Sequence, residues 1–266
     1  MLWPIFSSPI SDMLGHRMVI KIFTVLFTSQ GEHMTGRLST LTLLVTVALF
    51  PLAWAAEALQ TEERDWRLVT DRDGVLVYMS HNDDSSIKTF RGEAVVPMSD
   101  FRAIGNQVED YEFVASWMHM ISSISELGRT SGVDRTIWVT TRLPWPVSNR
   151  DAALDLHITQ EPESGSVLIA YEANDSLREP QSGYVRMPAL KGMLRFTPME
   201  PGQVHVTFEV VLDPGGYIPA WIANLILRDI PYFSLRRYQR VSDLEQFRGT
   251  DRGYYNIPAG WPGAAK

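Results

Sequence analysis

Apolar and polar side chains alternate along residues 203–212, where valine, phenylalanine or leucine occupies every second position. This period of two predicts a half-buried strand. Residues 213–216 (DPGG) interrupt the pattern, because proline and glycine reverse a chain at low cost. Apolar residues then recur three and four apart along residues 219–240, which predicts a long helix that begins at Pro219. Its first half is so apolar that a sheet or a bound apolar molecule must cover most of its surface.

The rest of the pattern predicts short strands joined by turns. Short helices are expected at residues 57–70, at residues 100–107 with Ser99 as the N-cap, and at residues 110–118. Further strands are expected at residues 75–79, 87–96, 121–129, 134–143, 151–160, 166–173, 184–187 and 192–197. Their hairpin spacing predicts an antiparallel sheet, so the class is α+β. A sheet that curls around one helix leaves a gap, and an apolar gap suits a small lipophilic molecule.

The composition removes several classes of function. The chain has 266 residues, of which 45% are hydrophobic and 21% charged, as in an ordinary globular protein. A formal net charge of -7 argues against nucleic-acid binding, which favours a basic face. The absence of cysteine excludes disulfides, thiolate nucleophiles and cysteine metal sites. Neither metal-ligand spacing nor a nucleophile motif occurs, so no catalytic residue or metal site is predicted.

The N-terminal region has the layout of an export signal. Arg37 precedes an apolar run at residues 38–50, and the run ends near Ala53-Trp54-Ala55. If translation starts at Met34, residues 34–56 form a signal peptide of normal length; the alternative is an uncleaved membrane anchor. Residues 1–33 are interpreted as a non-native or disordered extension. The expected location is therefore periplasmic or secreted, or membrane-anchored, with a main domain at residues 57–248 and a loose tail at residues 249–266.

Several segments resemble one known family. They are residues 73–78 (DGVLVY), 87–93 (IKTFRGE), 143–151 (LPWPVSNRD), 184–187 (YVRM), 196–198 (FTP) and 213–224 (DPGGYIPAWIAN). Together they make residues 65–244 similar to the START (StAR-related lipid-transfer) domains, as a bacterial exported member. The resemblance implies a helix-grip fold, in which a curved antiparallel β-sheet grips a long C-terminal α-helix over a tunnel for a lipid or sterol. It also implies no cofactor and, for plain members, no catalysis.

The function expected from this resemblance is that of a lipid-binding or lipid-transfer protein that holds one lipophilic molecule. Its partners would be that molecule and, transiently, a membrane; we expect a monomer and no nucleic acid. Because related grip-type folds include enzymes, a cyclase- or hydrolase-like activity stays an alternative. A third alternative is a membrane-tethered structural partner, if residues 38–55 stay attached.

Two arginines are the candidate polar anchors of the pocket. Arg150 shares strand parity with the apolar face, whereas Asp151 shares the wet face. A buried guanidinium needs hydrogen-bond acceptors. For Arg150 the alternatives are a carboxylate, backbone carbonyls at the corner of residues 144–146, or a ligand head group. Arg186 is the second candidate. The other predicted pocket residues, which either line the tunnel or fill it, are Trp138, Leu154, Met187, Phe208, Trp221, Ile222 and Leu225.

Overall fold

A computed structural model describes residues 64–82, 85–145, 147–216 and 218–264. All of them belong to one compact unit, Thr61–Lys266. The predicted signal peptide at residues 34–56 and the extension at residues 1–33 lie outside the described residues. Within the described ranges, every helix is too short or too polar to cross a membrane.

The described part of the chain forms one antiparallel sheet to which a short parallel strand is added. The strands are β1 (Arg67–Arg72), β2 (Val75–Asn82), β3 (Ser85–Met98), β4 (Ile121–Arg129), β5 (Asp134–Thr141), β6 (Arg150–Gln160), β7 (Val167–Ala173), β8 (Val185–Arg186), β9 (Ala189–Pro198) and β10 (Gly202–Asp213). Their order is β1-β2-β3-β10-β9-β7-β6-β5-β4, and β8 runs parallel to β6. The pairing of β3 with β10 joins the two halves of the sheet, because β3 and β4 lie far apart in it.

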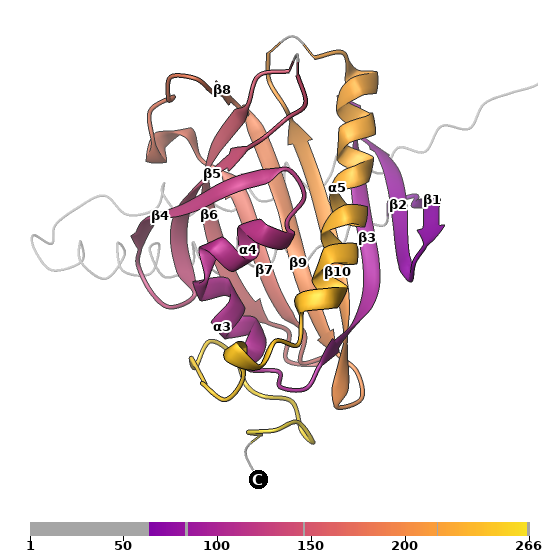
Figure 1. Cartoon of the computed structure of the whole chain (residues 1–266), viewed down its shortest axis with the longest axis vertical. Coiled ribbons are helices and arrows are strands. Elements are labelled where there is room, and N and C mark those ends of the chain that lie inside the picture. The colour runs from indigo at the N-terminus through magenta and orange to yellow at the C-terminus, as the bar shows by residue number, and fades with distance from the viewer. Residues whose placement is uncertain (1–63, 83–84, 146, 217, 265–266) are drawn as a thin grey trace, which may run out of the picture. The chain divides into compact units, whose positions relative to one another are not determined.

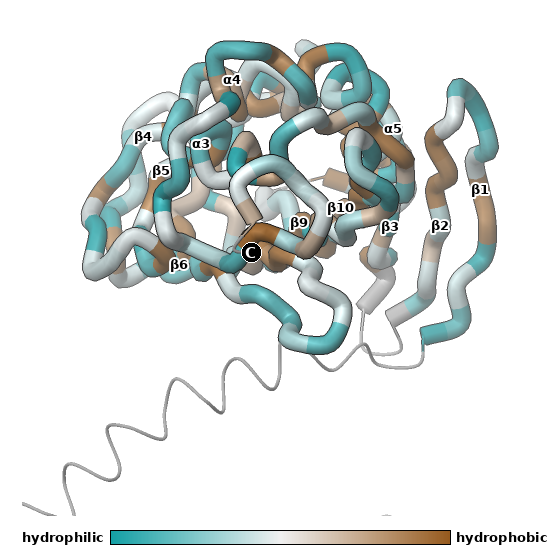
Figure 2. Tube along the Cα trace, turned by 90° about the horizontal axis from the view of Figure 1, so that it is seen from below, coloured by the Kyte–Doolittle hydropathy of each residue, from teal (hydrophilic) through white to brown (hydrophobic). Residues whose placement is uncertain are grey.

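The helices lie on the inner side of the curved sheet (Figures 1 and 2). They are α3 (Ala103–Glu109), α4 (Tyr111–Trp117) and α5 (Ala220–Val241), with 3-10 turns η1 (Asp175–Leu177) and η2 (Glu245–Phe247). The long helix α5 packs against β2, β3 and β10, whereas α4 packs against β4 and α5. The α+β class and the helix-grip arrangement predicted from the sequence are therefore confirmed.

A glycine in β3 sets how closely α5 approaches the sheet. A Cβ atom at Gly92 would lie 2.7 Å from the Cβ of Pro231 and 2.9 Å from a methyl group of Leu235. Only a residue without a side chain fits such a contact. The buried residues of α5 follow every third or fourth position: Ala223, Leu227, Pro231, Tyr232, Ser234, Leu235 and Tyr238.

Two local predictions near the start of the domain were wrong. The predicted helix at residues 57–70 is a strand, β1, over its described C-terminal part, because Asp73 and Gly74 form a two-residue hairpin with φ of 55° and 71°. Positive φ at both positions is the type I′ geometry that pairs two strands. Ser99 does not cap α3; its hydroxyl and backbone N–H both donate to Asp243, and α3 begins after Arg102.

The C-terminal segment is packed, so the prediction of a loose tail was wrong for its described residues, 249–264. The Tyr255 hydroxyl accepts from the backbone N–H of Gly105 at 2.8 Å and donates to the carbonyl of Phe101 at 2.9 Å. Trp261 is 4% exposed and its ring packs edge-on against Phe101. The many glycines and prolines of this segment make turns, while its aromatic side chains supply the buried surface.

Candidate ligand-binding cavity

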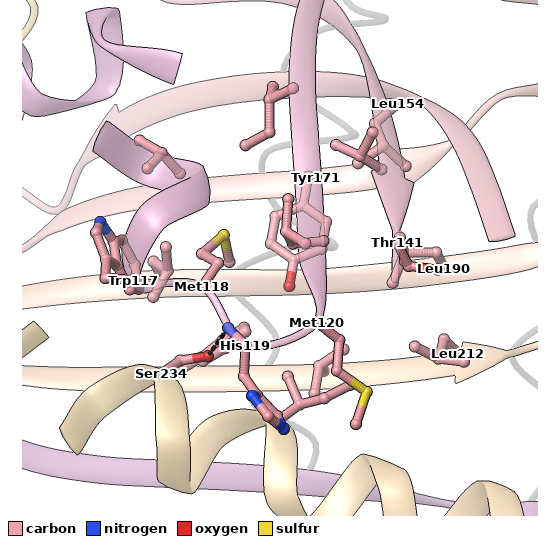
Figure 3. A pocket seen from close by; sticks show the side chains of 18 of the residues that line it. Trp117, Met118, His119, Met120, Thr141, Leu154, Tyr171, Leu190, Leu212 and Ser234 are labelled. Atoms are coloured by element: carbon pink, nitrogen blue, oxygen red, sulfur yellow. Dashed lines mark hydrogen bonds between the residues drawn. The ribbon is translucent and has the colours of Figure 1, made fainter. Parts of the chain in front are cut away.

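A cavity of about 160 Å³ lies between the inner face of the sheet and α5. Side chains from β5, β6, β7, β9 and β10 line one side of it, and side chains from α4, α5 and the segment that joins α4 to β4 line the other (Figure 3). The wall is almost wholly apolar. Representative members are Val114, Ile137, Leu156, Leu190, Phe196, Val210 and Ile226.

Four predicted pocket residues border this cavity. Leu154, Met187 and Phe208 are at most 3% exposed and contribute apolar surface. Arg150, also buried, is the one residue with a permanent charge among the described lining residues. Their contact with a ligand stays a prediction, but the parity that placed Leu154 and Phe208 on the inner face is confirmed.

Backbone oxygens hold the Arg150 guanidinium at one end of the cavity. Its Nε donates to the carbonyl of Pro214 at 3.2 Å, and its terminal nitrogens donate to the carbonyls of Ser148 and Gly215. No carboxylate lies within ion-pair distance of this guanidinium among the described residues. Burial lowers the pKa of Arg150 from its ordinary value. The partners are therefore backbone carbonyls, but they belong to Ser148, Pro214 and Gly215 and not to the corner of residues 144–146 that the sequence suggested.

Asp151 points to the other face of the sheet, where it is fully buried rather than solvated as predicted. The short strand β8 pairs with this end of β6, and the segment before it covers the face, with the Arg178 guanidinium over the Trp138 ring. Arg186 donates to both carboxylate oxygens of Asp151, at 3.1 and 2.9 Å, and the Trp138 ring nitrogen donates at 2.9 Å. Burial by itself raises the pKa of Asp151, but these hydrogen bonds outweigh it and hold the pKa below its usual value.

Arg186 and Trp138 therefore belong to a structural cluster outside the cavity. The Arg178 guanidinium lies 4.1 Å from the Trp138 ring centroid, and the Tyr184 ring meets Trp138 edge-on. Trp138 lies between Ile137 and Val139, which face inward, so strand alternation directs it outward. The placement of Arg186 and Trp138 on the cavity wall was wrong.

Three predicted pocket residues of α5 also lie outside the wall. Trp221 is 70% exposed and Leu225 is 47% exposed. Ile222 is half-buried, but it does not border the cavity. The residues of α5 that do so are Ala223, Ile226, Leu227, Ile230, Ser234 and Tyr238. Apart from Asn224 the first two turns of α5 are apolar, so periodicity could not identify the inner face.

Polar residues of the wall were missed by the sequence analysis. Tyr171 on β7 has the same parity as Val167 and Ile169, so strand alternation was a sufficient signal for it. His119 lies in the link between α4 and β4, where no periodic pattern exists; its backbone N–H donates to the Ser234 hydroxyl at 2.8 Å. Burial and the positive charge of Arg237 lower the pKa of His119, so its ring is neutral at pH 7.

Two loops meet at the end of the cavity where Arg150 lies. Leu143 belongs to one loop, and Pro214 and Ile218 belong to the other; all three line the cavity. Trp145 in the first loop is 92% exposed, and Trp221 follows the second loop in the first turn of α5. Two exposed indole rings thus lie on the segments that border this end.

A curved sheet closed by a C-terminal helix over an apolar cavity is the helix-grip arrangement. The START domain model matches residues 55–245 of this chain. An uncharacterized protein of Pseudomonas aeruginosa, PA1579, is 31% identical over 201 residues, which cover 75% of this chain and 95% of the relative. The chain belongs to the START domain family, whose members generally bind lipids or other hydrophobic ligands.

Solved structures of the same fold give the same result. The STAR-related lipid transfer protein of Xanthomonas axonopodis (fragment 25–204) superposes with a TM-score of 0.60 at 27% identity, covering 69% of this chain and 99% of that one. Human StAR-related lipid transfer protein 5 superposes with a TM-score of 0.65 at 16% identity, covering 77% and 99%. The second similarity, at this identity, shows the fold alone.

Proposed function

We propose that this protein holds one lipophilic molecule of the lipid or sterol type between its sheet and α5 and carries it between membranes. The observation that carries the proposal is the cavity of about 160 Å³ with an apolar wall in the middle of the domain. Burial of apolar surface favours the binding of a lipophilic ligand by about 25 cal/mol for each Å² of surface removed from water. The names of the lipid transfer proteins that share the fold support the same class of ligand.

A whole lipid requires the cavity to enlarge. Pockets that bury drug-sized ligands measure about 300–1,000 Å³, whereas this cavity measures about 160 Å³. The wall must therefore move outward when a sterol or phospholipid binds. The two loops that meet at Arg150 are the natural place, because α5 itself is held to β3 both by the close contact at Gly92 and by the hydrogen bond from the Lys88 backbone N–H to the Asn224 side chain.

The same end is our candidate for membrane contact. Trp145 and Trp221 are exposed on the two loop segments there, and tryptophan favours the boundary between lipid and water. Contact at this end would let a lipid pass from a bilayer into the cavity without crossing water. An extracytoplasmic location, as residues 34–56 indicate, belongs to this proposal and stays a prediction.

The lining residues favour a carrier over an enzyme. Among the described lining residues there is no aspartate or glutamate, and the one guanidinium is bound to backbone carbonyls. General acid–base catalysis at this wall would depend on His119 or a tyrosine without a carboxylate partner. The cyclase- or hydrolase-like alternative therefore has weaker support from the side chains at hand.

Transfer between vesicles tests the proposal. Purified, delipidated protein is mixed with donor vesicles that carry a fluorescent sterol or a fluorescent phosphatidylcholine, and with unlabelled acceptor vesicles. We expect a protein-dependent transfer of at least one of the two lipids, and a one-to-one complex in native mass spectrometry. Binding of neither lipid, together with no co-purifying molecule from native membranes, would contradict the proposal.

A further inference from the structure

The Tyr171 side chain brings a hydroxyl group to the cavity. Tyr171 lies on β7, and Figure 3 shows its ring extending from the sheet with the hydroxyl directed towards the space between the labelled side chains. Among the described residues, the hydroxyl has no hydrogen-bond partner. Burial raises the pKa of Tyr171, as does the Glu209 carboxylate, so the phenol stays protonated.

The sheet is shaped to hold this ring. Gly192 lies opposite Tyr171 on β9, and a Cβ atom at that position would be 2.6 Å from the ring carbon that carries the hydroxyl. Any larger residue at Gly192 would therefore displace the ring. The glycine thus leaves the space that the ring needs to present its hydroxyl in the wall.

Several other polar groups of the wall already have partners or lack accessible surface. The Thr141 hydroxyl bonds the backbone of Arg150, and the Tyr238 hydroxyl donates to Gln107 at 2.6 Å. The ring nitrogen of Trp117 and Nδ1 of His119 lack partners, but neither atom has accessible surface. In Figure 3 the Trp117 nitrogen is on the side of its ring away from Tyr171.

The surroundings of Tyr171 also restrict the charge of a ligand. Its partner across the β6–β7 pair is Leu156, six residues from Arg150, which is roughly 20 Å along the strand. An ionised carboxylate or phosphate beside Tyr171 would be buried far from that guanidinium, and burial of an unpaired charge is strongly unfavourable. An uncharged oxygen needs only one hydrogen bond.

We propose that the Tyr171 hydroxyl is the hydrogen-bonding anchor for an uncharged lipophile that carries a single hydroxyl or carbonyl oxygen on an apolar skeleton. This inference rests on the proposed function, because it assumes that the cavity takes a ligand. It assigns the polar oxygen of the ligand to the interior of the cavity and not to the Arg150 end. A phenylalanine would fill the same space without leaving an unpaired hydroxyl in the wall of the empty cavity.

A matched set of one-ring probes tests the anchor, since a cavity of this volume accepts molecules of that size. Binding of para-propylphenol, propylbenzene and para-propylbenzoate is measured by calorimetry for the wild type, Tyr171→Phe and Tyr78→Phe. Tyr78 is on β2, outside the cavity wall, and serves as the control for the loss of a tyrosine hydroxyl. We expect Tyr171→Phe to weaken the binding of para-propylphenol about three- to tenfold. The binding of propylbenzene should be unchanged or tighter. Tyr78→Phe should change the binding of neither probe.

The outcomes separate the anchor from the proposed function. If propylbenzene binds but Tyr171→Phe changes the two neutral probes equally, the anchor is wrong while the ligand cavity stands. If para-propylbenzoate binds as tightly as the phenol, the restriction to uncharged ligands is wrong. If no probe binds the wild type while the vesicle assay shows lipid transfer, the anchor is wrong and the proposed function stands; if neither is seen, both proposals fail.

Thermal unfolding of the empty protein gives a second readout. Because Tyr171→Phe removes a hydroxyl that faces the cavity without a protein partner, we expect its Tm to equal or exceed that of the wild type, by up to about 2–4 °C. A Tm that falls well below that of Tyr78→Phe would mean that the hydroxyl has a structural partner, and the anchor would be refuted.

Discussion

Filling the cavity from α5 changes stability and binding in opposite directions. Ala223 is 2% exposed and borders the cavity. Empty core volume costs about 24 cal/mol per Å³, so a cavity of about 160 Å³ corresponds to about 4 kcal/mol of stability that the fold forgoes. Ala223→Leu adds three carbon atoms, worth about 2 kcal/mol by transfer alone. After some steric cost, we expect the free energy of unfolding to rise by about 1–2 kcal/mol and lipid binding to be lost.

The assay combines urea unfolding with the vesicle-transfer measurement. Ala220→Leu is the matched control, because it adds the same atoms to the same helix three residues earlier, outside the cavity wall. It should leave transfer at the wild-type rate. A variant Ala223→Leu that is folded and still transfers lipid at that rate would refute the reasoning, because the filled cavity could not then be the ligand site.

Three further predictions concern the structure around the cavity. Asp151→Asn removes the buried charge partner of Arg186 and leaves only the exposed Asp175, so it should lower the free energy of unfolding by about 3–5 kcal/mol. Glu172→Gln, which breaks an exposed ion pair, should cost less than about 0.5 kcal/mol in the same urea titration. Trp261→Ala should cost about 3–5 kcal/mol, because the indole is buried; an unchanged midpoint would mean that the C-terminal segment is not packed. For Glu109, burial alone would raise the pKa, but hydrogen bonds and ion pairs with arginine and tyrosine side chains lower it to about 2. A lowered carboxyl pKa stabilises the fold above the unfolded value of about 4, so this contribution should disappear between pH 4 and pH 2, and thermal scans of Glu109→Gln should show a shallower loss over that range.

Strand alternation correctly predicted which of several residues face the cavity. A strand directs successive side chains to opposite faces, so the parity of Arg150, Leu154 and Phe208 determined which of them face inward. The same rule, applied to β5 and β7, would have excluded Trp138 and found Tyr171. These errors came from choosing aromatic residues by type and not by parity.

Local sequence patterns could not predict which face of α5 turns inward, or that the outer face of the sheet is covered at Asp151. Trp221 and Leu225 are as apolar as the buried residues of the helix, and the close contact at Gly92 decides which face turns inward. Asp151 has the parity of a wet face, yet a segment that follows β7 folds back and buries it. Both outcomes depend on contacts between residues that are distant in sequence, and no periodicity encodes them.

The volume of the cavity also depends on contacts between residues that are distant in sequence, and this volume bears on function. A domain is typically stable by about 5–15 kcal/mol, so about 4 kcal/mol lost to an empty cavity is a large share. The chain has simple ways to recover it, since a larger residue at Ala223 would fill space and a phenylalanine at Tyr171 would remove an unpaired hydroxyl. Instead, a ligand present at a concentration of a hundred times its Kd stabilises the folded state by about 2.7 kcal/mol. Departures from local consistency are expected where function requires them, and a cavity that stays open at this cost is explained if a lipophilic molecule occupies it.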